Sequence, residues 1–297
     1  MAKSTYIYDI LAVAIVAVWG MTFISSTVLL EYFSPAQLFA LRFSIAYLGM
    51  WLFSHDRLLC GSVRDELLML AAGVTGGSLY FLAENTALEL TVQTSAVSFI
   101  VCTTPLVTAI FSLLLGRSGA RLSWNLALGS ALSLGGVAMI VLNGSSLFGG
   151  PVSAYLLAVL ASFTWASYTL IVDSLQDRYP SAFITRKVFF WGLVTILPVL
   201  VVQHRSLDLK VFGEPVVILN IAFLAIVASL VCYALWNPII RKLGTIRSSN
   251  YIYLNPLFTF VGSMIFLNEP INWISVIGSL MTLGGVIVAG LRTSSRG

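Results

Sequence analysis

Apolar residues occur in long runs along this chain, and short connectors rich in charged residues, glycine and proline separate the runs. A helix needs about 20 residues to cross the roughly 30 Å hydrocarbon core of a bilayer, and each run has that length. Helices are expected because lipid offers no partner to backbone groups left unpaired. The pattern predicts an all-α integral membrane protein with ten transmembrane helices, over residues 7–29, 35–54, 66–88, 93–115, 122–142, 153–173, 182–202, 217–239, 247–267 and 272–291.

The same residues recur in the same order in the two halves of the chain. Between Trp124–Val137 and Trp273–Val286, 7 of 14 aligned positions are identical, and Pro105 corresponds to Pro256. We therefore expect two five-helix repeats, residues 1–146 and 147–297, that together form one transport domain. Because five is odd, the second repeat must enter the membrane inverted, and many secondary transporters place a site near the midplane between such repeats. A repeat kept for packing alone is the alternative.

Composition supports the membrane location and narrows the function. Hydrophobic residues make up 58% of the chain and charged residues 9%, against about 25% charged residues in soluble domains. The 3 cysteines show no CxxC spacing and both histidines fall in connectors, so we expect no cofactor, metal site or disulfide framework. No nucleic-acid partner is expected either. The first apolar run is too long for a signal peptide and is expected to remain as a membrane span.

Basic residues are distributed unevenly over the predicted connectors. With a cytoplasmic N-terminus, 11 of the 16 lysines and arginines lie on the inner side, and the outer connectors hold only Arg205 and Lys210. Cytoplasmic loops carry such an excess of positive charge. The asymmetry predicts a multi-pass protein of the inner (plasma) membrane with both termini in the cytoplasm. The inner residues are Lys3, Arg57, Arg64, Arg117, Arg121, Arg178, Arg241, Lys242, Arg247, Arg292 and Arg296.

Several motifs, some of them repeated in both halves, resemble those of a known family. They are Glu84-Asn85-Thr86-Ala87-Leu88, Ser95, Thr104-Pro105-Leu106, Asn255-Pro256-Leu257, Leu267-Asn268-Glu269-Pro270 and the Leu-Gly-Gly runs at 134–136 and 283–285. Together they resemble the ten-helix EamA-type permeases of the drug/metabolite transporter superfamily. The resemblance implies a transporter, commonly an exporter, of amino acids, their precursors, nucleobases, vitamins or other small metabolites. One departure is that the connector at 115–121 has no acid corresponding to Glu269.

Polar and aromatic residues inside the predicted spans are candidates for a central substrate-binding cavity. Glu84 is the sharpest, because an ionisable group at membrane depth costs about 2.5–3.5 kcal/mol and so needs a reason. It could bind a substrate amine or carry a coupling proton, or it could be an interfacial or helix-paired acid. The candidates are Trp19, Thr22, Tyr80, Glu84, Asn85, Ser98, Trp165, Tyr168, Tyr233, Asn237, Asn250 and Tyr251.

Two prolines and two arginines inside the spans suggest further roles. Pro105 and Pro256 remove a helical hydrogen bond, so we expect helix breaks or bending points that serve gating, with plain packing kinks as the alternative. Arg42 and Arg186 occupy similar places in the second and seventh spans. We expect both arginines to be structural, neutralising a carboxylate or reaching lipid headgroups.

Other functional classes fit the sequence less well. A membrane enzyme would need a cluster of catalytic residues at one membrane face, and an ion channel would need a charged ring or a carbonyl filter; neither is written here. We therefore predict a secondary-active exporter of small organic metabolites such as amino acids, working by alternating access. Import or exchange of a nucleobase, vitamin or sugar derivative, or a non-transporting channel or receptor, are the alternatives. Proton coupling stays open, as does the choice between a monomer and a weak oligomer.

Overall fold

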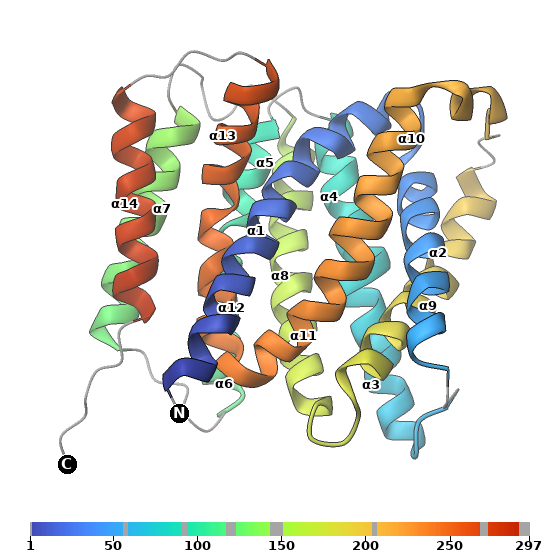
Figure 1. The fold of residues 1–297 in the computed structure, drawn as a ribbon, viewed down its shortest axis with the longest axis horizontal. Helices are drawn as coiled ribbons and strands as arrows, with labels where there is room; N and C mark the ends of the chain where they lie inside the picture. The colour runs from blue at the N-terminus through green and yellow to red at the C-terminus, as the bar shows by residue number, and fades with distance from the viewer. Residues whose placement is uncertain are drawn as a thin grey trace.

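The computed structural model describes residues 2–55, 59–90, 94–116, 123–142, 151–203, 207–267 and 273–290. Within these ranges all regular elements are helices, and no strand occurs. Figure 1 shows the helices side by side in one bundle. In chain order they are α1 (Ala2–Leu30), α2 (Pro35–Phe53), α3 (Val63–Gly73), η1 (Val74–Ser78), α4 (Leu79–Leu90), α5 (Thr94–Val101), α6 (Thr104–Leu114), α7 (Trp124–Leu142), α8 (Val152–Leu175), α9 (Ser181–Gln203), η2 (Leu209–Gly213), α10 (Pro215–Ala222), η3 (Phe223–Val231), α11 (Cys232–Leu243), α12 (Thr245–Asn250), η4 (Tyr251–Leu254), α13 (Asn255–Leu267) and α14 (Trp273–Gly290).

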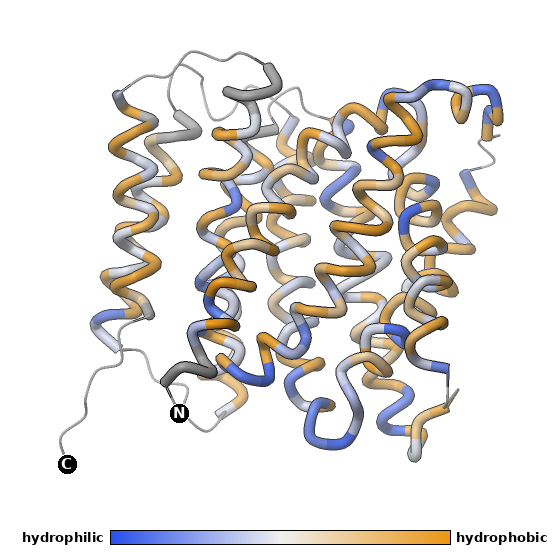
Figure 2. The backbone as a smooth tube through the Cα atoms, in the orientation of Figure 1, coloured by the Kyte–Doolittle hydropathy of each residue, from blue (hydrophilic) through white to orange (hydrophobic). Residues whose placement is uncertain are grey.

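Seven helical stretches among the described residues are long and apolar enough to cross a membrane. Two shorter apolar helices, Trp124–Met139 and Val276–Ala289, lie beside them. Apolar residues dominate the length of the helices, and polar residues gather toward the helix ends (Figure 2). The prediction of an all-helical, multi-pass membrane protein is confirmed. The seven stretches are Tyr6–Leu30, Pro35–Phe53, Val63–Leu90, Val97–Leu114, Val152–Leu175, Ser181–Gln203 and Pro215–Leu243.

Side-chain caps set the starts of several helices. Ser34 caps α2: its hydroxyl accepts from the Gln37 backbone N–H, and the Gln37 side chain accepts from the Ser34 N–H. Pro35 follows as the first helical residue, where a missing N–H does no harm. Ser62 caps α3 in the same way by accepting from the backbone of Asp65. These local signals place the helix starts next to the short connectors.

The helices that contain Pro105 and Pro256 are broken. The predicted run 93–115 is split, because α5 ends at Val101 and α6 begins at Thr104. The run 247–267 consists of α12, the 3₁₀ turn η4 and α13. A proline cannot donate to the carbonyl four residues earlier, and side chains bind those carbonyls instead. Thr104 Oγ1 donates to Val101 O at 2.6 Å, and Cys102 Sγ to Ile252 O at 3.4 Å, so the two breaks contact each other.

Helices α7 and α14 form a close pair at one edge of the bundle (Figure 1). Glycines permit the contact: a Cβ added at Gly136 would lie 2.4 Å from Gly278 O, and one added at Gly285 would lie 2.4 Å from Ser133 Oγ. An added Cβ at the neighbouring Gly135 would meet only Met281 Cε, at an ordinary 3.6 Å, and one at Gly284 would meet no atom within 4 Å. Each Gly-Gly pair therefore contributes one residue to the helix contact, as small residues do between membrane helices.

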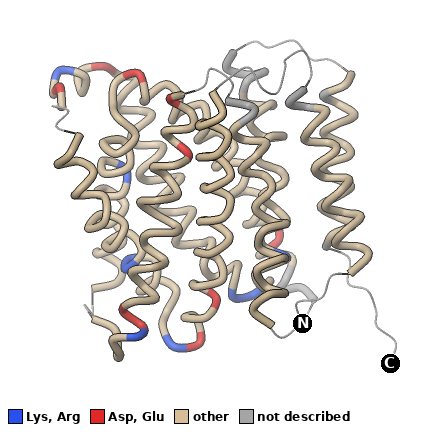
Figure 3. The backbone as a smooth tube through the Cα atoms, turned by 180° about the vertical axis from the view of Figure 1, so that it is seen from behind, with Lys and Arg blue, Asp and Glu red and all other residues tan. Residues whose placement is uncertain are grey.

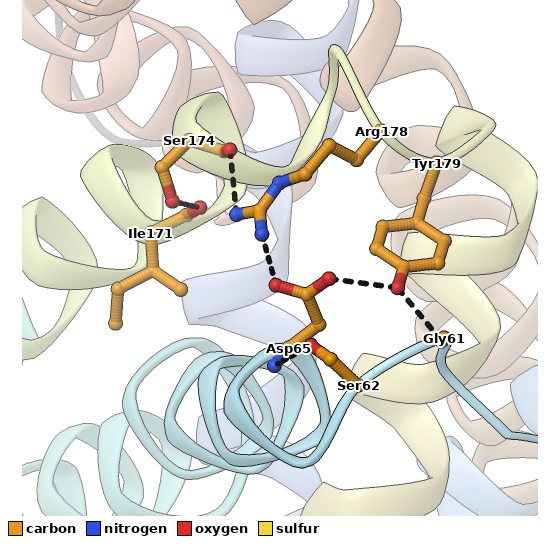
Figure 4. Close-up of polar contacts among 7 residues, drawn as sticks. All are labelled: Gly61, Ser62, Asp65, Ile171, Ser174, Arg178 and Tyr179. Carbon is orange, nitrogen blue, oxygen red and sulfur yellow. Dashed lines mark hydrogen bonds and ion pairs between the residues drawn. The ribbon is translucent and has the colours of Figure 1, made fainter.

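Charged residues gather at the two ends of the bundle, and few lie at mid-height (Figure 3). At the end where α1 begins, Arg247 Nη2 donates to both carboxylate oxygens of Asp9, at 2.9 and 2.8 Å. At the same end Asp65 accepts from Arg178 and from the Tyr179 hydroxyl (Figure 4), while Lys187 pairs with Glu66. These pairs link the first half of the chain to the second. Arg117, Arg121 and Glu269 lie outside the described residues.

Cys60 lies in the connector next to this charged end. Its backbone N–H donates to Glu66 Oε2 at 3.0 Å. Partial burial raises the pKa of the Cys60 thiol to about 12, and hydrogen bonding to the nearby Glu66 carboxylate adds to the rise. The thiol is therefore protonated at neutral pH.

Candidate functional site

A central cavity of about 440 Å³, counting space open to solvent, lies among helices from both halves of the chain. Helices α1, α2, α4, α5 and α6 from the first half and α8, α11, η4 and α13 from the second half each contribute at least one lining residue. The helix breaks at Val101 and Ile252 form part of its wall. The lining residues are Trp19, Thr22, Phe23, Arg42, Tyr80, Phe81, Glu84, Val101, Thr104, Trp165, Tyr233, Ile252 and Asn255.

Four aromatic rings of the cavity lining pack against one another, and we call them the aromatic box: Trp19, Tyr80, Trp165 and Tyr233. Trp165 is at its centre, with ring centroids 5.2 Å from Trp19, 4.9 Å from Tyr80 and 5.6 Å from Tyr233. Trp19 is held in place because its Nε1–H donates to Ala228 O at 3.1 Å. The Tyr233 hydroxyl donates to Gly76 O at 2.7 Å. Such rings give a ligand apolar surface with a defined shape.

Two residues of opposite charge line the same cavity. Glu84 is buried, and its Oε1 accepts from the Tyr80 hydroxyl at 3.0 Å. Arg42 is also buried; its Nε donates to Ser229 Oγ at 2.9 Å, and its guanidinium lies 4.3 Å from the centre of the Phe81 ring. Among the described residues no ion pair joins Arg42 to Glu84. Both side chains can therefore form ion pairs with a ligand in the cavity.

Half of the predicted site residues line the cavity. These are Trp19, Thr22, Tyr80, Glu84, Trp165 and Tyr233. They come from α1, α4, α8 and α11, which lie far apart in the sequence and meet at the centre of the bundle. The structure thus brings together residues that the sequence marked only as aromatic or polar positions inside apolar runs.

The other predicted residues lie outside the cavity lining. The buried Tyr168 hydroxyl donates to Asn237 Oδ1 at 2.9 Å, and Asn237 Nδ2 donates to Thr185 Oγ1 at 2.8 Å. This chain of hydrogen bonds supports Trp165 from behind, because the Tyr168 and Trp165 rings are 5.0 Å apart. The Tyr251 hydroxyl donates to Asp9 in the charged end of the bundle. The remaining three, all buried, are Asn85, Ser98 and Asn250.

Arg42 is the main residue that sequence reasoning assigned differently. It was expected to be structural, but its side chain lines the cavity rather than reaching a headgroup. Arg186, at the similar place in the second half, fits the structural expectation, since it donates to Ser54 O and lies over Phe183. The sequence does contain a sign that Arg42 has a function: it lies in the middle of an apolar span, where a charged side chain is as costly as Glu84 and needs a reason in the same way. The other lining residues missed were Phe23, Phe81, Val101, Thr104, Ile252 and Asn255.

Nothing in the described part of the chain suggests a metal centre, since it contains no group of three histidine, cysteine, aspartate or glutamate residues that could hold an ion. The cavity contains aromatic rings, hydroxyls, one amide, one cation and one carboxylate. Such a lining can bind an organic molecule of modest size that has both apolar and charged parts.

The family model of the EamA-like transporter family matches this chain twice, over residues 6–142 and 152–291. The chain belongs to the EamA-like transporter family. The family and the relatives named as transporters or efflux pumps indicate a membrane transporter of small molecules. The resemblance to EamA-type permeases in the sequence is confirmed.

Relatives similar to this EamA-like chain extend over most of its length. A protein of Archaeoglobus fulgidus named "Uncharacterized transporter" is 26% identical over 91% of this chain and 92% of its own length. An Escherichia coli protein named "Probable amino-acid metabolite efflux pump" is 24% identical, with 95% of each chain covered. A Streptantibioticus cattleyicolor protein named "Probable terminal-alkyne amino-acid exporter" is 24% identical over 78% of this chain and 76% of its own.

A solved structure also has this fold. Its TM-score to the EamA-like chain is 0.71 at 18% sequence identity, and the match covers 97% of this chain and 96% of the other. At this identity the likeness describes the fold alone.

Proposed function

We propose that the protein is a secondary-active exporter of small organic metabolites, with amino acids or related compounds as the substrate class, and that it works by alternating access. The observation that carries the proposal is the central cavity, which is lined from both halves and contains an aromatic box, Arg42 and Glu84. Membership of the family indicates a transporter, and the Escherichia coli and Streptantibioticus cattleyicolor relatives are named for amino-acid efflux or export. The proposal brings that substrate class to this chain.

We further propose that the ten helical spans form two inverted repeats, residues 1–146 and 147–297. Three features support this arrangement. The family model matches once in each half. A π-helical segment, η1 or η3, interrupts the third span of each half, and a break next to a proline interrupts the fourth. In Figure 1, α3 to α4 and α10 to α11 run in opposite directions. Pro105 and Pro256, at the contacting breaks, are then suited to act as bending points between the two access states.

We also propose that the protein lies in the inner (plasma) membrane with both termini in the cytoplasm. The end of the bundle at which α1 begins contains Arg178 and Arg247, paired with Asp65 and Asp9. A cytoplasmic position for this end agrees with the excess of basic residues in the connectors. A monomer is sufficient, because both halves of the cavity come from one chain. The candidate coupling ion is a proton, and Glu84 is the acidic residue among the described residues of the cavity lining.

Counterflow in liposomes tests the proposal. Purified protein is placed in vesicles loaded with an unlabelled compound, and uptake of the labelled compound is followed for a panel of amino acids, nucleobases and vitamins. We expect saturable counterflow of one or more amino acids and none in protein-free vesicles. Counterflow of a nucleobase or vitamin alone would move the substrate class, and no counterflow of any compound by folded protein would contradict a transport function.

A further inference from the structure

The two charges in the central cavity are buried, face the same space and do not neutralise each other directly. Charged side chains inside a membrane protein usually pair with each other, because an unpaired charge there is costly. The described ion pairs follow that rule at the charged end of the bundle, where Asp9, Asp65 and Glu66 each have a basic partner. Arg42 and Glu84 do not pair with each other. They are separated by more than the 4.0 Å that defines an ion pair.

Each of the two side chains makes one hydrogen bond to the described residues and keeps free hydrogen-bonding capacity. Arg42 donates through Nε to Ser229, and its two terminal nitrogens make no hydrogen bond to the described residues. Those two nitrogens form the part of a guanidinium that binds a carboxylate through two parallel bonds. Glu84 is anchored through Oε1 by Tyr80, so Oε2 makes no such bond. A carboxylate oxygen of this kind accepts hydrogen bonds from an ammonium group.

We propose that the cavity selects zwitterions, with Arg42 binding the carboxylate of the substrate and Glu84 binding its ammonium group. A molecule with one charge provides an opposite charge to one of the two residues and none to the other. A molecule with both charges satisfies both and keeps the cavity electrically neutral. The inference rests on the proposed function, because it assigns the chemistry of recognition to the transporter's central cavity.

The two halves of the chain contribute differently to this recognition. Both charges come from the first half, from α2 and α4. With Asn85 matched to Asn237, Glu84 corresponds to Trp236, which is apolar and buried against Trp19 at 4.8 Å between ring centroids. The second half contributes neutral residues to the cavity, Trp165, Tyr233, Ile252 and Asn255. The head group of the substrate is therefore oriented toward the first half, and its side chain contacts the aromatic box.

The test uses three molecules that share a side chain and differ in which charged groups they carry. They are L-phenylalanine, phenethylamine, which lacks the carboxylate, and 3-phenylpropionate, which lacks the ammonium group. A second series of leucine, 3-methylbutylamine and 4-methylpentanoate gives an aliphatic side chain. Binding to purified protein is followed through tryptophan fluorescence excited at 295 nm, since Trp19 and Trp165 line the cavity. We expect at least one zwitterion to bind and both of its analogues to bind at least ~30-fold more weakly, because removal of one partner of a buried charge pair costs about 2 kcal/mol or more.

Charge variants at Glu84 and Arg42 test which residue binds which group. Glu84→Gln is expected to weaken zwitterion binding and to reduce the preference over 3-phenylpropionate. Arg42→Gln is expected to reduce the preference over phenethylamine, and Arg42→Lys is expected to keep part of the preference. Glu89→Gln, an exposed acid on the same helix as Glu84, and Arg241→Gln, an exposed arginine, are the matched controls and should bind like the wild type. Monodisperse elution and an unchanged helical circular dichroism spectrum select the variants that fold.

The outcomes separate this inference from the proposed function. If neither zwitterion binds, or if the single-charge analogues bind as tightly as the zwitterions, the inference is wrong, while counterflow of any metabolite would still support a transporter. If both variants weaken all three molecules of a series equally, Arg42 and Glu84 shape the cavity without reading the head group, and the assignment is overturned. If no compound shows counterflow, the result contradicts the proposed transport function itself.

Discussion

Replacing Gly136 by alanine tests the close packing of α7 against α14. A Cβ at this position would lie 2.4 Å from Gly278 O, 2.5 Å from Thr282 Oγ1 and 2.6 Å from the Thr282 nitrogen. Ordinary contacts of a Cβ begin at 3.4 Å. Two of these atoms belong to the backbone of α14, so rotation of a side chain cannot relieve the clash. The two helices must separate locally by about 1 Å, the difference between 3.4 and 2.4 Å.

The size of the effect follows from the separation and from a matched control. A gap of about 0.5–1 Å removes roughly a quarter to a half of each dispersion contact across it, and overpacking of this kind costs about 1–3 kcal/mol. Gly135→Ala changes the neighbouring residue, whose Cβ would meet only Met281 Cε at 3.6 Å. Both substitutions gain the same helix propensity, about 1 kcal/mol for alanine over glycine. The free energies of unfolding of the two variants should therefore differ by about 1–3 kcal/mol.

Thermal melting of the purified variants in one detergent provides the measurement. We expect Gly135→Ala to melt at or above the wild-type temperature and Gly136→Ala to melt below both. The same contrast is expected between Gly284→Ala, which has open space, and Gly285→Ala, whose Cβ would lie 2.4 Å from Ser133 Oγ. Equal melting temperatures within each pair would refute the argument that the second glycine of each pair sets the helix contact.

Three further predictions concern the cavity, the charged end and the thiol. Trp165→Ala removes the central ring of the aromatic box and should lower counterflow by ~10-fold or more. Trp124→Ala, at a residue that is 76% exposed, should leave counterflow unchanged. Initial counterflow rates in liposomes with equal amounts of folded protein test both expectations. Asp65→Asn should lower the free energy of unfolding by about 2–3 kcal/mol, because the buried carboxylate binds both Arg178 and Tyr179. Arg178→Gln should lower it less, because that side chain is 42% exposed. Melting curves that rank the two variants in the opposite order would contradict this. Cys60, with its pKa raised to about 12, should be thiolate in roughly one part in 10,000 at pH 8 and react slowly with maleimide. The thiolate fraction rises with pH, so the rate should rise tenfold per pH unit, and Glu66→Gln should lower the pKa and speed the reaction; a native rate at pH 8 equal to that of denatured protein would contradict the raised pKa.

The membrane fold could be predicted from the sequence because lipid imposes one strong rule on every span. Runs of about 20 apolar residues must be helices, and the helices α1, α2, α8 and α9 fall where those runs lie. The breaks beside Pro105 and Pro256 were also predictable, since proline lacks the N–H of the helical bond. The π-helical segments η1 and η3 were not, because neither contains a proline and a π-helix differs from an α-helix in its backbone hydrogen bonding, which no residue in them announces.

The candidate site was predictable only in part, because it depends on which helix faces meet. Glu84 and Tyr80 stand four residues apart on one helix, and their hydrogen bond follows from that spacing. The contact of Trp165 with Trp19 joins residues from opposite halves, which a single sequence cannot place together. Tyr168 and Asn237 have the same composition signal as the lining residues, yet they bond to each other behind the cavity wall. The place of Arg42 in the cavity lining was not predictable, because its partner residues Ser229 and Phe81 lie in other helices.

Blocking the cavity chemically tests most directly whether it is the route of transport. Thr22 lines the cavity, so Thr22→Cys in a Cys60→Ser background offers a thiol there, while the two remaining cysteines are buried. Glu89→Cys in the same background is the control, because Glu89 is exposed. We predict that maleimide stops counterflow by the Thr22→Cys protein, that a transported substrate slows the labelling, and that the labelled control keeps full activity. Full counterflow by protein labelled completely at Thr22→Cys would contradict transport through this cavity.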